Sequence, residues 1–271
     1  MGTMTTGGPP AVPATTGVVT TVRAAGAYDV VTLTVPDAGT WAAARPGQLV
    51  VVPVDPTRGS VLPEVHWLAG VHADPVHGTS LELVLDAGRD TAPGEAIRLL
   101  GPLGRGFSPP STPVPVVLVG HEAGALPLRW LVTMVRQRGC TAHVVLSAAD
   151  PERHLDLVHL RRHARAVVLA LPEDLPAALE RVLDAPDVDA AVVYAAAPVP
   201  VLREVAGRAL ARGLPVRAAA LDLDGPGPVC GTGLCGGCDL EVPDAAGTRV
   251  LRPCLEGPVV PGELLVEEAR R

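Results

Sequence analysis

Residues 230–238 read Cys-Gly-Thr-Gly-Leu-Cys-Gly-Gly-Cys, and a further cysteine follows after fifteen residues. The four cysteines, spaced C-x4-C-x2-C-x15-C, are Cys230, Cys235, Cys238 and Cys254. Thiolates are soft ligands that favour iron–sulfur centres and zinc, and four of them complete the cysteine shell of a [2Fe–2S] cluster. The first three have the spacing of plant-type ferredoxins. We therefore predict a [2Fe–2S] cluster on these four side chains.

The glycines between the cysteines favour iron–sulfur over zinc. Glycine permits positive φ and lets backbone N–H groups approach the sulfurs of a cluster, whereas a structural zinc needs no such cradle. Zinc sites more often pair two short Cys-x2-4-Cys knuckles, and here Cys254 stands alone. Zinc remains the main alternative. Disulfides are the weakest alternative, because a cytosolic chain would keep these thiols reduced.

Charge and hydropathy exclude some classes of function. The formal net charge is −7, and residues 222–271 hold nine acidic side chains against four arginines. The absence of a basic face argues against nucleic acid as a partner. No apolar run approaches the length of a membrane span, and the N-terminus lacks the pattern of a secretory signal. We expect a cytoplasmic protein that does not bind membranes, with a disordered tail over residues 1–16.

The order of strand-like and helix-like runs divides the chain into two successive regions. Short alternating or β-branched runs come first, at Val18–Val22, Val30–Val35, Gln48–Val54, Leu81–Leu85 and Ile97–Leu100. Separated by Pro and Gly turns, they predict a small antiparallel β-barrel over residues 17–108. Apolar runs then alternate with helix-like stretches such as Leu126–Arg138, Leu175–Leu183 and Val201–Arg212. This order predicts an α/β domain with a parallel sheet over residues 113–221.

The last block, residues 222–271, carries the cysteines. It is too short for the larger sheet domain that holds a plant-type cluster in ferredoxins, since seventeen residues follow Cys254. We therefore expect a loop-rich [2Fe–2S] appendage that folds around its metal.

Three further stretches extend the pattern beyond the cysteines. Residues 45–48 read Arg-Pro-Gly-Gln, residues 100–107 read Leu-Gly-Pro-Leu-Gly-Arg-Gly-Phe, and residues 253–259 read Pro-Cys-Leu-Glu-Gly-Pro-Val. With the predicted domain order and the cysteine motif, they resemble the electron-transfer subunits of dihydroorotate dehydrogenase, within the ferredoxin-reductase superfamily. The resemblance covers about residues 17–262.

That resemblance implies that the barrel over residues 17–108 is of the FAD-binding type and the α/β domain over residues 113–221 of the NAD-binding type. It implies a subunit with FAD in its barrel and a [2Fe–2S] cluster at its C-terminal end. It also implies electron transfer between a nicotinamide and the FMN of a dihydroorotate dehydrogenase-like catalytic partner. We accordingly expect a hetero-oligomer active in pyrimidine biosynthesis. The chain would be an oxidoreductase subunit rather than an independent catalyst, and we assign it no catalytic residue.

The flavin motif departs from the family pattern. The family strand whose arginine and hydroxyl hold the flavin diphosphate corresponds here to Glu64-Val65-His66-Trp67, which would turn a carboxylate toward the phosphates. The later phosphate turn reads Gly-Arg-Asp-Thr at residues 88–91. Gly88 and Thr91 are therefore the predicted flavin-binding residues, and Arg89 could partly offset the acids. These changes weaken the case for FAD.

The nicotinamide motif departs further. Residues 120–127 read Gly-His-Glu-Ala-Gly-Ala-Leu-Pro, with His and Glu where the family has glycines that admit a pyrophosphate. The family Cys-Gly-Pro near the hydride-transfer site corresponds to Ala196-Ala197-Pro198. We therefore expect no NAD(P) binding. Two other functions stay open: a stand-alone NAD(P)H-dependent flavin reductase, and a non-redox subunit that uses the cysteines for zinc.

Overall fold

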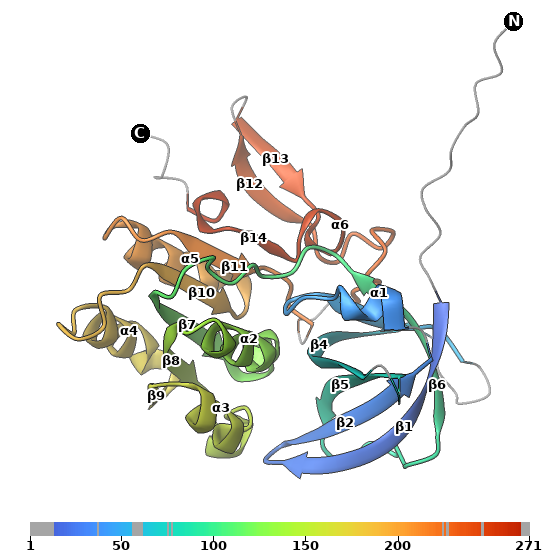
Figure 1. The fold of residues 1–271 in the computed structure, drawn as a ribbon. Helices are drawn as coiled ribbons and strands as arrows, with labels where there is room; N and C mark the ends of the chain where they lie inside the picture. The colour runs from blue at the N-terminus through green and yellow to red at the C-terminus, as the bar shows by residue number, and fades with distance from the viewer. Residues whose placement is uncertain are drawn as a thin grey trace, which may run out of the picture.

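The structure is a computed structural model that describes residues 14–36, 38–55, 62–74, 76, 78–223, 225, 228–244 and 247–266. A β-barrel and an α/β domain lie side by side, and a hairpin with its flanking loops lies across one end of both (Figure 1). The predicted fold class is thus confirmed. No helix among the described residues is long and apolar enough to cross a membrane.

The barrel closes with the strand order β1-β2-β5-β4-β3-β6. Its elements are β1 (Ala14–Ala25), β2 (Tyr28–Val35), α1 (Ala38–Ala42), β3 (Leu49–Val52), β4 (Glu64–Asp74), β5 (Gly78–Asp86) and β6 (Ala96–Leu103). All the strand pairs are antiparallel, and alternate side chains such as Val31, Leu33 and Val35 are buried inside. The N-terminal tail was predicted to reach Thr16, but Ala14–Thr16 belong to β1, where they pair with β6.

The α/β domain is built on a six-stranded sheet of order β14-β11-β10-β7-β8-β9. Its elements are β7 (Pro115–His121), η2 (Glu122–Ala125), α2 (Leu126–Gln137), β8 (Thr141–Ser147), η3 (Pro151–Arg153), α3 (Leu157–His163), β9 (Ala166–Ala170), η4 (Pro172–Asp174), α4 (Leu175–Leu183), β10 (Val192–Ala196), α5 (Val199–Leu210) and β11 (Val216–Ala219). Strands β7 to β11 are parallel. Helices α2 and α3 cover one face and α4 and α5 the other (Figure 1). Burial on both faces explains why Val116–Val119 is continuously apolar.

The C-terminal segment is joined to both bodies. It contains the hairpin β12 (Leu240–Asp244) and β13 (Gly247–Leu251), then α6 (Pro253–Glu256), β14 (Val259–Pro261) and η5 (Gly262–Leu264). Strand β14 adds to the parallel sheet, antiparallel to β11. The appendage therefore contains more regular structure than the sequence indicated.

A buried ionic network joins the barrel to α2. Arg129, 4% exposed, lies with Nη1 2.6 Å from Glu82 Oε2 of β5 and Nε 3.1 Å from Asp156 Oδ2. It also donates to Ala69 O of β4 at 3.3 Å. Arg23 of β1 reaches the same Asp156 oxygen at 2.8 Å. Because these contacts cross the interface, they fix the α/β domain against the barrel.

Candidate functional site

The loop that carries three of the cysteines directs backbone N–H groups at their sulfurs. The N–H groups of Thr232, Leu234 and Cys235 lie 3.4, 3.2 and 3.4 Å from Cys230 Sγ. The N–H of Gly237 lies 3.3 Å from Cys235 Sγ. Burial acts to raise the pKa of Cys230, but hydrogen bonds from the Thr232 side chain and from these N–H groups lower it to about 6. The hydrogen bonds of the loop thus favour the thiolate form of Cys230 even without a bound metal.

Glycine is required where this loop curls against its neighbours. Gly233 has φ +79°, and a Cβ there would lie 2.2 Å from Leu255 Cδ1. Gly231 has φ +69°, and its Cβ would lie 2.6 Å from Val51 Cγ2 and 3.5 Å from Val65 Cγ2. The loop therefore packs directly on strands β3 and β4 of the barrel.

The Cys254 thiol lies near those of Cys238 and Cys230, but the four thiols do not form a closed cage. Cys254, in α6, is buried, and burial together with the nearby Cys238 thiol raises its pKa to about 12; Cys230 contributes to the same shift. The Cys235 thiol donates to Pro228 O at 3.1 Å. Across the described part of the chain, no three His, Cys, Asp or Glu side chains converge in a metal-binding arrangement.

The donor set nevertheless fits a [2Fe–2S] cluster. Four soft sulfur donors are available, and the N–H groups around them are the contacts that stabilise cluster sulfurs. A Cβ at Gly237 would lie 2.1 Å from Pro228 O and 3.5 Å from Cys235 Sγ. Glycine at that position therefore lets the chain pass close to the Pro228 carbonyl, while the sulfur lies at an ordinary contact distance. Cys230, Cys235, Cys238 and Cys254 remain the predicted ligands.

Arg252 was not among the predicted site residues, yet it braces the cysteine loop. Its Nε and Nη2 lie 2.6 and 2.8 Å from the two carboxylate oxygens of Asp239, and its Nη1 donates to Gly233 O at 2.9 Å. It therefore joins the segment before Cys254 to the loop that carries the other three cysteines. Arginine is frequent in this sequence, so composition could not single it out.

Two of the three stretches that extended the sequence pattern tie the barrel to the third, which contains Cys254 and the residues after it. Gln48 Nε2 donates to Gly104 O at 2.8 Å, which holds the Arg-Pro-Gly-Gln turn against the end of β6. The N–H of Arg105 donates to Gly257 O, and its carbonyl accepts from the Val259 N–H at 3.1 Å. These stretches therefore position the cysteine-bearing segment as well as the barrel wall.

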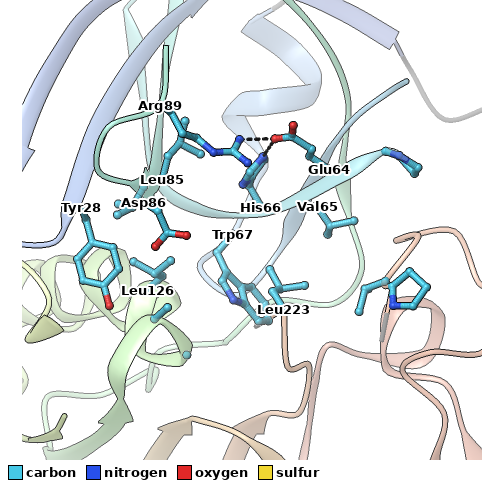
Figure 2. A pocket seen from close by; sticks show the side chains of 16 residues that line it. Tyr28, Glu64, Val65, His66, Trp67, Leu85, Asp86, Arg89, Leu126 and Leu223 are labelled. Carbon is cyan, nitrogen blue, oxygen red and sulfur yellow. Dashed lines mark hydrogen bonds and ion pairs between the residues drawn. The ribbon is translucent and has the colours of Figure 1, made fainter. Parts of the chain in front are cut away.

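A pocket of about 280 Å³ lies between the barrel, the η2 turn and the segment before Cys230. Trp67 and Tyr28 come from the barrel and Leu126 from the α/β domain (Figure 2). Val229 also lines the pocket and immediately precedes Cys230. A planar ligand held here would therefore lie beside the predicted cluster.

One side of this pocket is closed by an ion pair. Arg89 and His66 converge on the Glu64 carboxylate (Figure 2), and His66 Nε2 lies 3.2 Å from Glu64 Oε2. Hydrogen bonding to His66, opposed by burial and supported by Arg89, lowers the pKa of Glu64 to about 2. Asp86 adds a second carboxylate. The cation available for a pyrophosphate is thus already paired with an acid, so the polar side of the pocket does not fit FAD well.

The two predicted flavin-binding residues lie near this ion pair. Gly88 has φ +85°, and its N–H donates to Asp29 Oδ2 at 3.2 Å. The N–H of Thr91 donates to Arg89 O at 2.8 Å, and Thr91 lines a second pocket, of about 780 Å³, that shares Glu64 and Arg89 with the first. Their role in binding flavin remains a prediction.

The turn that would hold a nicotinamide pyrophosphate is filled by contacts with neighbouring residues of the same domain. Glu122 has φ +44°, unusual for a residue with a side chain, and its Oε1 accepts from the Ala149 N–H at 3.1 Å. A Cβ at Gly124 would lie 3.0 Å from Ala197 Cα. The turn thus contacts the end of β10 directly and adds a carboxylate where phosphates would need cations.

The fold is that of the ferredoxin reductases. It is similar to the NADH-dependent reduced ferredoxin-NADP oxidoreductase studied for flavin-based electron bifurcation, with a TM-score of 0.68 and 18% identity over 92% of this chain and 88% of that one. It is also similar to the ferredoxin reductase of carbazole 1,9a-dioxygenase, with a TM-score of 0.59 and 18% identity over 78% of this chain and 70% of that one. At these identities the likeness establishes the fold alone.

Sequence comparison narrows the resemblance. Residues 229–266 match the iron–sulfur cluster binding domain of dihydroorotate dehydrogenase B. The chain is 29% identical over 236 residues to the electron transfer subunit of dihydroorotate dehydrogenase B (NAD(+)) of Geobacillus kaustophilus, covering 79% of this chain and 84% of that protein. The same subunit of Desulforamulus reducens is 27% identical over 183 residues, covering 65% of this chain and 68% of that protein. The resemblance predicted from the sequence is thus confirmed.

Proposed function

We propose that this chain is an electron-transfer subunit with a [2Fe–2S] cluster on Cys230, Cys235, Cys238 and Cys254. Its partner is a flavoprotein catalytic subunit of the dihydroorotate dehydrogenase type, which places the pair in pyrimidine biosynthesis in the cytoplasm. The observation that carries the proposal is the coincidence of N–H groups aimed at cysteine sulfurs with the family match over residues 229–266.

A [2Fe–2S] cluster supplies one-electron transfer when bound, and the residues around the loop determine how well it serves. N–H groups of Thr232, Leu234 and Gly237 stabilise negative charge on sulfur and so help to set the reduction potential. Arg252 places a cation beside the loop through Gly233 O. Packing of the loop on the barrel holds it rigidly next to the pocket between the two domains.

This chain exposes apolar side chains beside the cysteines, where an electron-transfer partner can dock. Leu234 is 88% exposed and Leu255, in van der Waals reach of Gly233, is 55% exposed. Large exposed apolar side chains next to a redox centre are typical of a docking site.

Leu234→Asp should impair electron transfer to the partner by about tenfold or more while leaving iron content unchanged, because the side chain is exposed and its N–H contact to sulfur is retained. Reduction of the cluster by dithionite and of the partner's flavin through the cluster would be followed separately by absorbance. Val250→Asp, at another exposed apolar position in β13, is the matched control. Wild-type transfer rates in Leu234→Asp would place the docking surface elsewhere.

We further propose that Glu64 weakens flavin binding at the pocket. Glu64→Arg should increase FAD affinity by about 1.5–3 kcal/mol, because it removes like-charge repulsion, releases Arg89 and adds a charge-assisted contact. Glu64→Gln, which only removes the charge, should give a smaller gain. Fluorescence titration with FAD would measure both. Tight binding by the wild-type chain that the arginine weakens would show that this strand does not face the diphosphate.

Two other functions make different spectroscopic predictions. A stand-alone flavin reductase would purify with a flavin spectrum and oxidise NAD(P)H without a partner, which the closed η2 turn argues against. A zinc-binding subunit would be colourless. Absorption spectra with iron, sulfide and zinc analysis of aerobically purified protein would distinguish these from the proposed electron-transfer subunit, and co-purification would identify its partner.

A further inference from the structure

The outer edge of the parallel sheet is an unprotected β-strand. Strand β9 pairs with β8 on one side and, within the described residues, with no strand on the other. It lies at the end of the sheet farthest from the hairpin β12–β13 (Figure 1). Such an edge presents unpaired N–H and C=O groups that can pair with another strand.

Protein sheets usually protect such edges with charges, prolines or bulges. Strand β9 reads Ala-Val-Val-Leu-Ala and contains none of these. The opposite edge, β14, is three residues long and ends in Pro261. The sheet is therefore protected at one edge and open at the other.

The open edge also exposes apolar side chains on one face. Side chains alternate along a strand, so Val167, Leu169 and Leu171 point the same way; Leu171 is still in extended conformation. Leu169 is 38% and Leu171 48% exposed. The apolar stripe therefore continues past the end of β9 to the start of η4.

Charges of opposite sign flank this stripe. Arg165 immediately precedes β9 and Glu173 follows it, and both are exposed. Neither forms an ion pair with another described residue. A strand with a basic residue before it and an acidic residue after it is complementary to its own copy when the two run antiparallel.

We propose that two copies of this chain associate through β9, in antiparallel register about a two-fold axis at Leu169. In that register Leu169 faces its counterpart, Val167 faces Leu171, and Arg165 faces Glu173, so apolar and opposite-charge pairs are formed together. The sheet becomes continuous across both copies. Because the cysteine loop lies toward the β14 edge, both predicted clusters stay accessible to other partners.

The test is sedimentation velocity of the full, cluster-loaded chain over a range of concentrations. We expect a monomer–dimer equilibrium. Arg165→Glu and Glu173→Arg should each weaken association by about tenfold or more, since each replaces two symmetry-related attractive pairs by repulsive ones. The double variant R165E/E173R should restore it. Leu169→Asp should abolish dimers by placing two carboxylates face to face, whereas Val250→Asp, on the hairpin, should not.

Each outcome bears on the proposal. A chain that stays monomeric at every concentration would overturn it. Dimers that persist unchanged in both Leu169→Asp and Arg165→Glu would place the interface elsewhere and also overturn it. Failure of the charge swap to restore association, when both single variants disrupt it, would overturn the antiparallel pairing. Circular dichroism of each variant verifies that its fold is intact.

Discussion

Replacement of Cys235 by serine should abolish the [2Fe–2S] cluster. A serine oxygen is a hard ligand and a poor substitute for a thiolate on iron. Because the metal contributes free energy to folding of the segment that binds it, residues 228–266 should also become more open to proteolysis. Iron and acid-labile sulfide per chain, with the visible absorption spectrum, would measure the loss, which we expect to be nearly complete.

Cys140→Ser provides the matched control. Cys140 is a free cysteine, but it is buried immediately before β8, where its thiol is 3.8 Å from Thr112 O, away from the cysteine loop. Iron and sulfide should stay at wild-type levels in this variant. Equal iron and sulfide in Cys235→Ser and the wild type would refute the ligand assignment. Stoichiometric zinc in the wild type without sulfide would favour the zinc alternative.

The parts of the fold that were predictable from sequence are those with local periodicity. The stretch Leu175–Leu183 was predicted as helix and is α4, and the apolar run Val116–Val119 lies inside β7. Elements that depend on distant partners were missed. Strand β14 has three residues, one of them proline, and exists because β11 offers an edge to pair with. No pattern within Val259–Pro261 could indicate that.

The candidate site likewise has a part that the sequence predicted and a part that only the fold creates. Cysteine spacing indicated the predicted ligands, because a cluster needs four sulfur ligands and three of the cysteines lie within residues 230–238. The braces around them were not predictable. Arg252 acts on Asp239, thirteen residues away, through a bidentate contact that only the fold creates. The departure of the nicotinamide turn from the family pattern was visible in its His and Glu, yet the positive φ of Glu122 and the packing of the turn became apparent only in the structure.

The second large effect concerns the buried arginine between the domains. Arg129→Met should destabilise the protein by about 3–5 kcal/mol, because it removes the Arg129 cation from Glu82 and leaves the buried Asp156 with only the half-exposed Arg23. Burial acts to raise the pKa of Asp156, but hydrogen bonds from Arg23 and Arg129 hold it below the usual value. This stabilisation is present above the unfolded-state pKa of 3.8 and is lost as the pH falls through the lower folded-state pKa. Urea unfolding at neutral pH measures the cost of the substitution.

Arg23→Met tests whether burial is the cause. Arg23 contacts the same Asp156 oxygen, but its side chain is 54% exposed, so its loss should cost no more than about 1 kcal/mol. The triple variant R129M/E82Q/D156N should recover much of the loss, since no buried charge is then left without a partner. Equal costs for Arg129→Met and Arg23→Met would mean that the network does not fix the domains. A cost confined to Arg129→Met would show that the buried contacts of Arg129 hold α2 against β4. These two elements contribute Leu126 and Trp67 to the pocket beside the cysteines, so the same contacts also maintain the pocket.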